Sequence, residues 1–465
     1  MKHSTINFFS LFSNLKLERR ANGFLKSMIK KESYSVLSIS ENWASAMGNY
    51  RMLNNKNVGI EDIKQGIIND CARKANCTHA LVLQDTTQPN YEKHRGRIKP
   101  NSGLGVIGDN KSLGYFMHPS LVMNAESGDI YGSSDIRTWI REEDRNVKNE
   151  AERKQTPIEQ KESYRWLDSI EQSKKILTGC EMLTSISDRE GDIYEVFSKT
   201  PNEKTHLLIR SRDNRRIAEG KLFDYLSSQN IAGTYELKVR GDIRTKRKSR
   251  KAIIELRIAK VKLKKPKTLK KYDKYAETVE VWAIEAKEKE STVPKAEKPI
   301  HWRLLTTHKV DTFLMGALVV FWYSLRWNIE QLFRVLQNKG FNVESSELEK
   351  GTSIIKLGMF ALAASIKVMQ LLLASKWDSN QAIEQVFNEN EIKCLKESCK
   401  KYEGKTEKLK NRYSPDTLKW ASWVIARIGG WKGYASQRPP GPITFFKGLY
   451  NFNLIYEGWC IAKRF

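Results

Sequence analysis

Three acidic residues stand where carboxylates commonly act in catalysis. Asp85 follows the apolar run 79–84, and Asp188 follows the apolar run 182–187. Both runs are expected to be strands of an α/β sheet, so carboxylates at their ends point toward one edge of the sheet. Glu330 lies in an amphipathic helical stretch. Three such groups have the hard oxygen ligands that Mg²⁺ or Mn²⁺ prefers, and two metals held by carboxylates can catalyse phosphodiester cleavage.

The stretch 323–337 predicts one helix with two adjoining stripes. At about 100° per residue its apolar side chains fall on one face, as expected of a helix that packs on a core. A polar stripe beside them consists of Tyr323, Arg326, Glu330, Arg334 and Gln337. Arg and Glu four residues apart also pair on the solvated flanks of ordinary helices, and Asp after a strand commonly caps a loop. Periodicity alone therefore does not bring the three carboxylates together.

The charge of the chain favours a polyanionic partner. Its 465 residues include 80 Lys and Arg against 54 Asp and Glu, a net charge of +26. Such an excess suits nucleic acid or an anionic membrane surface, although some bacterial proteomes are simply rich in lysine. The 40% hydrophobic content and 12 tryptophans exclude a disordered chain. A chain of this length is expected to form about two to four domains.

Cysteine usage and hydropathy predict a cytoplasmic protein. The six cysteines show no Cys-x-x-Cys pair and no zinc-like spacing with the seven histidines, so we expect free thiols in a reducing compartment. The apolar patch 6–12 is too short and too poorly flanked to predict a signal peptide. The segment 354–374 is long enough to span a bilayer, but it contains Lys356 and Lys367. We therefore expect a buried core helix and no membrane partner.

The first part of the chain, residues 1–70, predicts a small helical domain. A cluster of basic side chains, including Arg19 and Arg20, lies early in it. A cationic helical module suits contacts to the DNA backbone. The same composition also suits a plain helical cap on the next domain, and both interpretations remain open.

The rest of the chain divides into two further predicted domains. Residues 71–365 mix short strands with helices, and a β-type alternation runs through about 231–300. Basic stretches in that part, 244–251 and 264–267, either contact phosphate or are simply solvated. Residues 366–465 predict a helical C-terminal domain.

Three groups of residues resemble the signatures of the DDE transposases of bacterial insertion sequences, in the branch with a Tyr-Arg-Glu-Lys motif that includes the transposon five transposase. They are Asp85-Thr86-Thr87, Ser187-Asp188-Arg189-Glu190-Gly191-Asp192-Ile193 and Tyr323-x-x-Arg326-x-x-x-Glu330. The resemblance runs from about Arg19 to Trp431, and it includes Lys161-Glu162-Ser163 with Trp166 and the stretch 418–430. The order and spacing of these groups match those of the family.

This resemblance implies a ribonuclease-H-like α/β catalytic core with a β-rich insertion, flanked by an N-terminal helical DNA-binding domain and a C-terminal helical dimerisation domain. It implies that Asp85, Asp188 and Glu330 bind two Mg²⁺ or Mn²⁺ ions. The implied activity is cut-and-paste transposition, in which strand cleavage at the element ends is followed by strand transfer. The implied partners are double-stranded DNA, both inverted-repeat ends and target, and a second copy of the chain in a synaptic complex.

The resemblance also implies several DNA contacts. Tyr323 and Arg326 match residues that engage the terminal phosphates and a flipped base near the cut. Trp302 matches the aromatic residue that stacks on that base. Taken by itself, Trp302 is more typical of a core tryptophan beside a strand. Arg210 and Arg212 are expected on the DNA backbone, because guanidinium groups bind phosphate in a bidentate manner.

One position departs from the family pattern. Seven residues after Glu330 the family has Lys, whereas this chain has Gln337, which can hydrogen-bond a phosphate but brings no charge. Arg334, one turn after Glu330, is better placed to substitute, and Lys339 lies roughly opposite on an unbroken helix. The alternative function is therefore a catalytically impaired, transposase-derived DNA-binding protein or an inhibitor of transposition.

Overall fold

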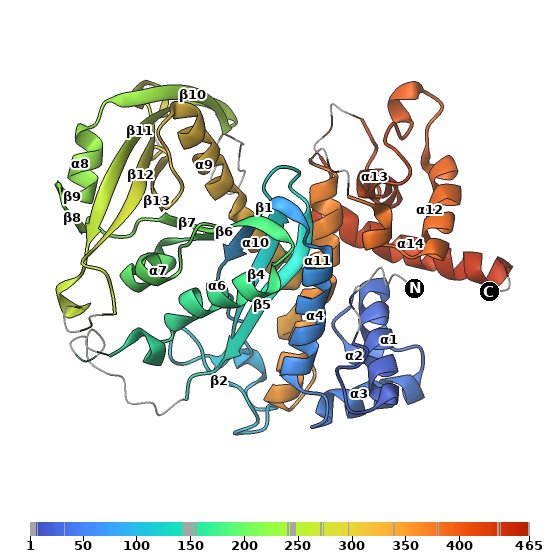
Figure 1. Cartoon of the computed structure of the whole chain (residues 1–465). Helices are drawn as coiled ribbons and strands as arrows, with labels where there is room; N and C mark the ends of the chain where they lie inside the picture. The colour runs from blue at the N-terminus through green and yellow to red at the C-terminus, as the bar shows by residue number, and fades with distance from the viewer. Residues whose placement is uncertain are drawn as a thin grey trace.

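The computed structural model has a mixed α/β fold built around one large sheet (Figure 1). It describes residues 6, 8–31, 33–142, 152, 156–239, 241, 248–269, 272, 274–295, 297–337, 340–377, 379, 381–434, 437 and 439–463. Lys339 and half of the basic stretch predicted at 244–251, residues 244–247, lie outside these residues.

Five strands form the part of the sheet that positions the candidate site. They are β1 (Cys77–Gln84), β4 (Phe116–Asn124), β5 (Ile130–Trp139), β6 (Cys180–Ser187) and β7 (Thr205–Arg210). Their order is β5-β4-β1-β6-β7. β1, β4 and β5 form an antiparallel meander, whereas β6 and β7 run parallel to β1. This arrangement is consistent with the ribonuclease-H-like core that the sequence predicts.

The sheet continues through the stretch predicted to be rich in β structure. The further strands are β13 (His301–Thr306), β12 (Thr278–Glu288), β11 (Arg250–Lys264), β10 (Ile231–Val239), β8 (Arg216–Ile217) and β9 (Gly220–Lys221); a separate small sheet holds β2 (Gly105–Val106) and β3 (Leu113–Gly114). β13 pairs antiparallel with β7, and β12 pairs with β13. The further strands therefore extend the central sheet and do not form a separate sheet. Much of β11 alternates buried and exposed side chains, which explains the alternation in its sequence.

Helices cover both faces of this sheet. They are α6 (Tyr164–Ile176), α7 (Tyr194–Lys199) and α8 (Leu222–Ser228) on one face, and α9 (Phe313–Leu325), α10 (Trp327–Leu336) and α11 (Gly351–Ala374) on the other. Successive strand residues point to opposite faces. Leu207 and Ile209 of β7 accordingly join the core under α6 to α8, whereas Leu208 joins the core under α9 to α11.

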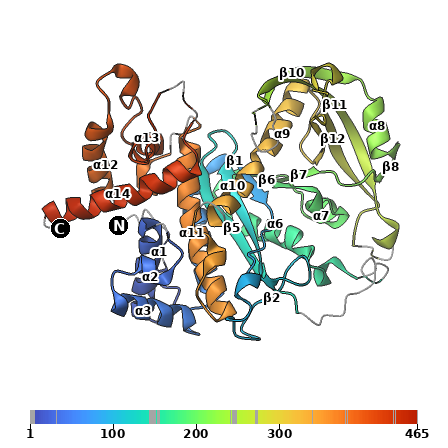
Figure 2. The ribbon, with the colours of Figure 1, turned by 180° about the vertical axis from the view of Figure 1, so that it is seen from behind.

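The remaining helices belong to the two ends of the chain. They are α1 (Leu15–Lys31), α2 (Val36–Ile39), α3 (Trp43–Asn54) and α4 (Ile60–Lys74), and α12 (Glu389–Tyr402), α13 (Leu418–Ile428) and α14 (Pro442–Lys463). Figures 1 and 2 show α1 to α3 and α12 to α14 together beside α11, on the side away from β10 to β13. The predicted domain boundaries at 70 and 366 fall inside α4 and α11, and the division into domains stays a prediction.

The prediction of a buried core helix at 354–374 is confirmed by α11. This helix is long and apolar enough to cross a membrane, but its apolar window is completely buried within the protein. Nζ of Lys356 donates to the carbonyl oxygens of Leu53 at 3.0 Å and Asn55 at 2.8 Å. Nζ of Lys367 lies 4.9 Å from the centre of the Phe387 ring, and burial lowers the pKa of this lysine. These contacts explain how an apolar helix accommodates two lysines.

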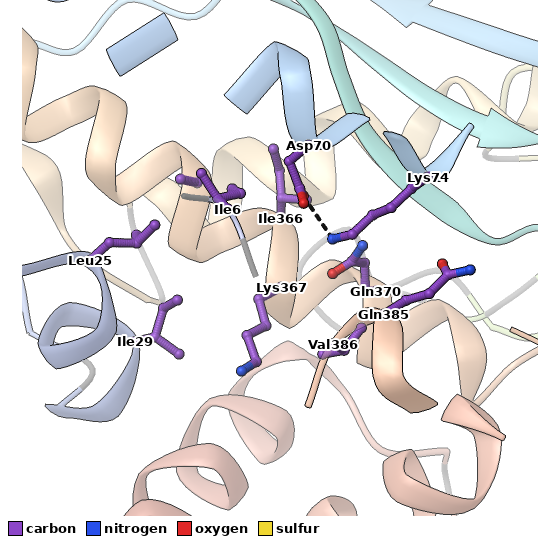
Figure 3. Close-up of a pocket in the computed structure, with 11 residues that line it drawn as sticks. Ile6, Leu25, Ile29, Asp70, Lys74, Ile366, Lys367, Gln370, Gln385 and Val386 are labelled. Atoms are coloured by element: carbon purple, nitrogen blue, oxygen red, sulfur yellow. Dashed lines mark hydrogen bonds and ion pairs between the residues drawn. The ribbon is translucent and has the colours of Figure 1, made fainter. Parts of the chain in front are cut away.

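A small cavity lies where α1 and α4 meet α11 (Figure 3). Its volume is about 20 Å³, and its lining includes Leu25, Ile29, Asp70, Lys74 and Lys367. Nζ of Lys74 donates to Oδ2 of Asp70 at 2.7 Å across one wall. A cavity of this size has room for a single water molecule. The junction between the N-terminal helices and α11 is therefore packed and offers no ligand pocket.

Three histidines meet at the end of the sheet opposite Asp85 and Asp188. Nε2 of His79 and Nε2 of His308 each lie 2.7 Å from Oγ1 of Thr184. The ring of His206 stacks on His308 with a centroid distance of 4.0 Å. Burial, with a smaller contribution from the neighbouring histidines, lowers the pKa of His79 to about 4 and that of His308 to about 3. Both rings are therefore neutral in the folded protein at neutral pH.

We expect the free energy of unfolding to fall as the pH drops below about 6.5. The unfolded chain then protonates His79 and His308, whereas the folded chain does not until their lowered pKa values are reached. Each group contributes up to about 1.4 kcal/mol per pH unit over that interval. Urea unfolding at pH 7.5 and 5.0 should show a smaller pH effect for His308→Gln. An equal effect in the variant and the parent protein would contradict this role.

Candidate active site

The ends of β1 and β6 place Asp85 and Asp188 next to each other. Leu83 of β1 pairs in parallel with Ile186 of β6, and each aspartate lies two residues further along its strand. Neighbouring strands lie about 4.8 Å apart. The two carboxyl groups therefore leave the same edge of the sheet at equivalent positions, as the sequence led us to expect.

Arg326 joins the third carboxylate, Glu330, to this edge. Nη1 of Arg326 donates to Oδ2 of Asp85 at 2.9 Å, and its Nη2 donates to Oε1 of Glu330. The side chains of Arg326, Asp85 and Glu330 are only 14, 23 and 28% exposed. Charge-assisted hydrogen bonds of this kind are strong when they are sheltered from water. One guanidinium group thus ties the start of α10 to the end of β1.

The stretch 323–337 is not the continuous helix that its periodicity predicts. α9 ends at Leu325 and α10 begins at Trp327, with Arg326 at the junction. The backbone tightens there, because Arg326 N donates to Tyr323 O at 3.0 Å and Ile329 N donates to Arg326 O at 3.1 Å. Arg326 keeps helical dihedral angles, φ −50° and ψ −33°, so the side-chain pattern hardly reveals the break.

The electrostatics of this edge favour a bound cation. Burial raises the pKa of Asp85 to about 6; Arg326 opposes this rise, and the nearby Asp188 adds to it. Burial also raises the pKa of Tyr323, against the effect of Arg326 and Arg210. Neighbouring carboxylates repel each other when both are ionised, and a positive charge between them relieves that repulsion. Arg326 supplies the positive charge in this structure.

A polar cluster around Asp85 was not anticipated from the sequence. Thr86 N donates to Oδ1 of Asp85 at 2.8 Å, and Oγ1 of Thr86 lies 2.9 Å from Nδ1 of His118. Nε of Arg165 donates to Oγ1 of Thr86 at 3.1 Å, and its Nη2 donates to Glu190 at 2.8 Å. Arg165 and Thr86 are 79 residues apart, so local spacing carries no signal of this contact. The cluster fixes the backbone at Asp85.

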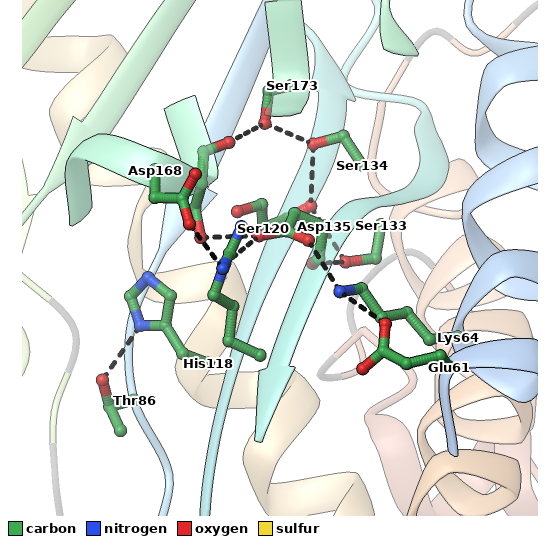
Figure 4. A network of polar contacts seen from close by, with 12 residues as sticks. Glu61, Lys64, Thr86, His118, Ser120, Ser133, Ser134, Asp135, Asp168 and Ser173 are labelled. Atoms are coloured by element: carbon green, nitrogen blue, oxygen red, sulfur yellow. Dashed lines mark hydrogen bonds and ion pairs between the residues drawn. The ribbon is translucent and has the colours of Figure 1, made fainter. Parts of the chain in front are cut away.

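A buried network behind this cluster holds α4 and α6 against the sheet (Figure 4). Its centre is Asp135 of β5, which is 1% exposed. Oδ2 of Asp135 accepts from Nε of Arg137 and Oγ of Ser169, each at 2.8 Å, and Nζ of Lys64 lies 3.5 Å from Oδ1. Burial lowers the pKa of His118 well below its ordinary value, so its ring is neutral. The network positions α6, which carries Arg165.

Two aromatic residues expected at the DNA pack against each other. Trp302 is half-buried on β13, and Tyr323 is only 4% exposed. Their ring centroids lie 5.2 Å apart at an interplanar angle of 72°. The two rings therefore form an edge-to-face pair beside Arg326, and stacking of a base on Trp302 stays a prediction.

Arg210, the last residue of β7, and Arg212, two residues later, differ in their surroundings. Parallel pairing of β6 with β7 sets Arg210 beside Asp188, and Nη2 of Arg210 donates to the carbonyl oxygen of His301 at 3.4 Å. Arg212 is exposed, and its Nε donates to Oδ2 of Asp213 at 2.9 Å. Arg210 thus belongs to the candidate site, whereas Arg212 lies on the surface near it.

Arg334 and Gln337, which were expected to take the place of the family's lysine, contact residues other than the three carboxylates. Arg334 lies over the half-exposed ring of Trp327, with Cζ 5.3 Å from the ring centroid. Nε2 of Gln337 donates to Oε1 of Glu344 at 3.5 Å. Within the described part of the chain, neither side chain forms an ion pair with the three carboxylates.

Arg19 and Arg20 are exposed on α1, where they help to line an open groove. The groove has a volume of about 490 Å³, runs between α1 and α3, and also includes Lys16 and Glu41. Nη1 of Arg20 donates to Oδ1 of Asn49 at 3.4 Å. A groove with three cationic side chains beside the start of a helix suits a phosphate backbone.

No family model matches the chain. Among solved structures, the chain is similar to the piggyBac transposase in a synaptic complex with hairpin DNA, with 10% sequence identity and a TM-score of 0.38 over 91% of this chain. The match covers 61% of that transposase chain, so our chain spans less than two thirds of its length. A similarity this low assigns neither a fold nor a function.

Asp85, Asp188 and Glu330 are chemically suitable ligands for a divalent metal. In this structure, however, Asp85 and Glu330 are arranged around the guanidinium group of Arg326. Over the described residues, no three His, Cys, Asp or Glu side chains lie close enough to hold one metal ion. Asp85 and Glu330 instead share the positive charge of Arg326. Carboxylate oxygens such as those of Asp85, whose pKa burial raises to about 6, are chemically appropriate ligands for Mg²⁺ or Mn²⁺. An ion bound there would take over the role that Arg326 has in this structure.

Proposed function

We propose that the chain is a DDE transposase that cuts DNA at the ends of a mobile element and joins those ends to a target. The observation that carries this proposal is the pairing of Asp85 with Asp188 at equivalent ends of β1 and β6, with Glu330 linked to Asp85 through Arg326. These residues lie in the three sequence groups that resemble the family's signatures. The mixed order of β5-β4-β1-β6-β7 supports the same proposal.

In the proposed reaction, Asp85, Asp188 and Glu330 would hold two Mg²⁺ or Mn²⁺ ions. The chemistry that such ions would supply is activation of a water molecule and stabilisation of the charge that develops in an in-line displacement at phosphorus. The raised pKa of Asp85, about 6, still leaves this carboxyl ionised at neutral pH. Arg326 then exchanges its carboxylate partners for a DNA phosphate, which its planar fork can bind in the same bidentate manner. Arg210, beside Asp188, is placed to hold a neighbouring phosphate.

Double-stranded DNA is the proposed partner, and the cytoplasmic nucleoid is the proposed location. The net charge of +26 favours binding to a polyanion. The groove with Arg19 and Arg20 is the proposed contact to the element end, and the exposed Arg212 and the partly exposed Arg334 would add backbone contacts. Gln337 would contribute a neutral hydrogen bond in place of the family's lysine.

A homodimer is proposed because two element ends require two active subunits. Exposed apolar residues follow one face of α14 at intervals of seven, four and seven: Ile443, Tyr450, Leu454 and Ile461 are 45, 39, 50 and 78% exposed. This spacing is typical of a helix that pairs with another helix. The stripe supports a contact between two copies through their C-terminal helices.

We expect the protein to cleave a supercoiled plasmid that carries the element's inverted repeats when Mn²⁺ is present. The DNA flanking the gene supplies the candidate repeats. The same plasmid without repeats, and reactions with a chelator, are the matched controls. Absence of cleavage by folded protein that binds the repeats would contradict the proposed activity.

The second candidate function is a DNA-binding protein without catalytic activity, such as an inhibitor of transposition. The bonding of Gln337 to Glu344, and of Arg326 to two of the three carboxylates, favours this alternative. Binding without cleavage on the same end DNA would support it.

A further inference from the structure

Two thiols face each other where β1 and β6 begin. Cys77 and Cys180 are the first residues of these strands and stand directly opposite each other in their parallel register. Sγ of Cys77 donates to Sγ of Cys180 at 3.5 Å. The two residues are 103 positions apart in the sequence, so only the pairing of the two strands brings them together. The other ends of the same strands lead to Asp85 and Asp188.

The backbone at this pair of thiols already has the geometry that a disulfide requires. Neighbouring strands lie about 4.8 Å apart, and a disulfide joins Cα atoms that are about 4.4–6.8 Å apart. Residues that stand opposite each other in a sheet direct their side chains to the same face. A bond between the two sulfur atoms therefore requires rotation of the side chains and no movement of the strands.

The hydrogen bond between the two thiols makes them chemically different. The bond from Cys77 lowers the pKa of the acceptor Cys180, against the effect of burial. The same bond, together with burial, raises the pKa of the donor Cys77. The thiolate is the nucleophilic form of cysteine. Cys180 is therefore the sulfur that reacts first with an oxidant, and Cys77 is placed to attack the oxidised product.

Three of the other four cysteines are less suited to this chemistry. Cys71, Cys394 and Cys399 are buried, and burial raises the pKa of each thiol. Cys77 and Cys180 are both partly exposed, so a small oxidant can reach them. Among the residues that the structure describes, these two cysteines alone have sulfur atoms within hydrogen-bonding distance of each other.

We propose that Cys77 and Cys180 are a modification site at which hydrogen peroxide forms a reversible disulfide. The thiolate of Cys180 attacks one oxygen of the peroxide, the O–O bond breaks and hydroxide leaves, so that Cys180 becomes a sulfenic acid. The sulfur of Cys77 then attacks the sulfenic sulfur, and its S–H proton leaves with the S–OH hydroxyl as water. The two thiols are oxidised to one disulfide, and the peroxide takes up their electrons. A dithiol reduces the bond again by exchange.

The disulfide would join the two strands that end at the candidate active site. All six cysteines are free thiols in this structure, so the bond would form only on oxidation. Transient disulfides of this kind commonly act as redox sensors. The proposal does not rest on the proposed transposase activity, because it involves none of the three carboxylates.

The test is treatment of the full chain with a small excess of hydrogen peroxide, followed by alkylation of the remaining thiols and peptide mapping by mass spectrometry. We expect the protein to lose two of its six thiols. The peptides that contain Cys77 and Cys180 should be cross-linked, and dithiothreitol should release them. Cys460→Ser is the matched control, because Cys460 is a partly exposed cysteine on α14, and this variant should form the cross-link like the parent protein.

Two serine variants test the order of the two steps. Cys77→Ser should accumulate the sulfenic acid of Cys180, which dimedone traps, whereas Cys180→Ser should give little adduct at Cys77. Thermal unfolding before oxidation checks that both variants are folded. Absence of the cross-link in the folded parent protein would overturn the proposal, and so would a cross-link of Cys180 to Cys71 in its place. Equal dimedone adducts in the two variants would overturn the assigned order.

Discussion

Replacement of Asp188 by Asn is expected to reduce Mn²⁺-dependent DNA cleavage by at least about a thousandfold while the fold and DNA binding persist. Oδ1 of Asp188 accepts from the backbone N–H of Glu190 at 2.9 Å, at the start of a short 3-10 helix, Arg189–Gly191. The amide oxygen of Asn can accept the same bond, so the local turn is retained. Asn at position 188 has no negative charge, however, and is therefore a much weaker metal ligand than Asp188.

The measurement is the rate of plasmid cleavage together with the affinity for the end DNA. Asp85→Asn and Glu330→Gln should show losses of similar size, and a double variant should lose little more, because groups that act as one unit are not additive. Glu171→Gln is the control, since Glu171 pairs with Lys174 on the surface of α6. Cleavage at the parental rate by Asp188→Asn would show that the three carboxylates are wrongly assigned.

Replacement of Arg326 by Ala is expected to destabilise the metal-free protein by about 1–3 kcal/mol, because Asp85 and Glu330 lose the cation that they share. This loss is smaller than that of breaking a fully buried pair, since both carboxylates retain some contact with water. Added Mn²⁺ should then raise the melting temperature of the variant more than that of the parent protein. A divalent ion no longer has to displace the guanidinium group.

Thermal unfolding with and without Mn²⁺ measures both effects. Arg334→Ala is the matched control, because Arg334 lies over Trp327 and not between carboxylates. It should show neither the loss of stability nor the larger response to metal. An equal response of the parent protein and Arg326→Ala would mean that the metal does not bind where Arg326 now lies.

The sequence by itself determined the elements whose patterns are local. Apolar runs ending in Asp85 and Asp188 predicted strands, and β1 and β6 confirm them. The lysine-containing apolar segment at 354–374 predicted a buried helix, which α11 confirms. Alternation of side chains over about 231–300 predicted strands that the structure contains. In each case the burial of neighbouring side chains follows directly from the period of the element.

Only the tertiary structure decided how the candidate site is assembled. Arg326 contacts Asp85 across 241 residues of sequence, so spacing within a helix can indicate its pairing with Glu330 but not this second partner. The same holds for Arg165, whose bond to Thr86 depends on the docking of α6 against the sheet. A helical pattern records which face of a segment is buried. It does not record which distant carboxylate a buried cation neutralises, because that depends on how separate elements pack.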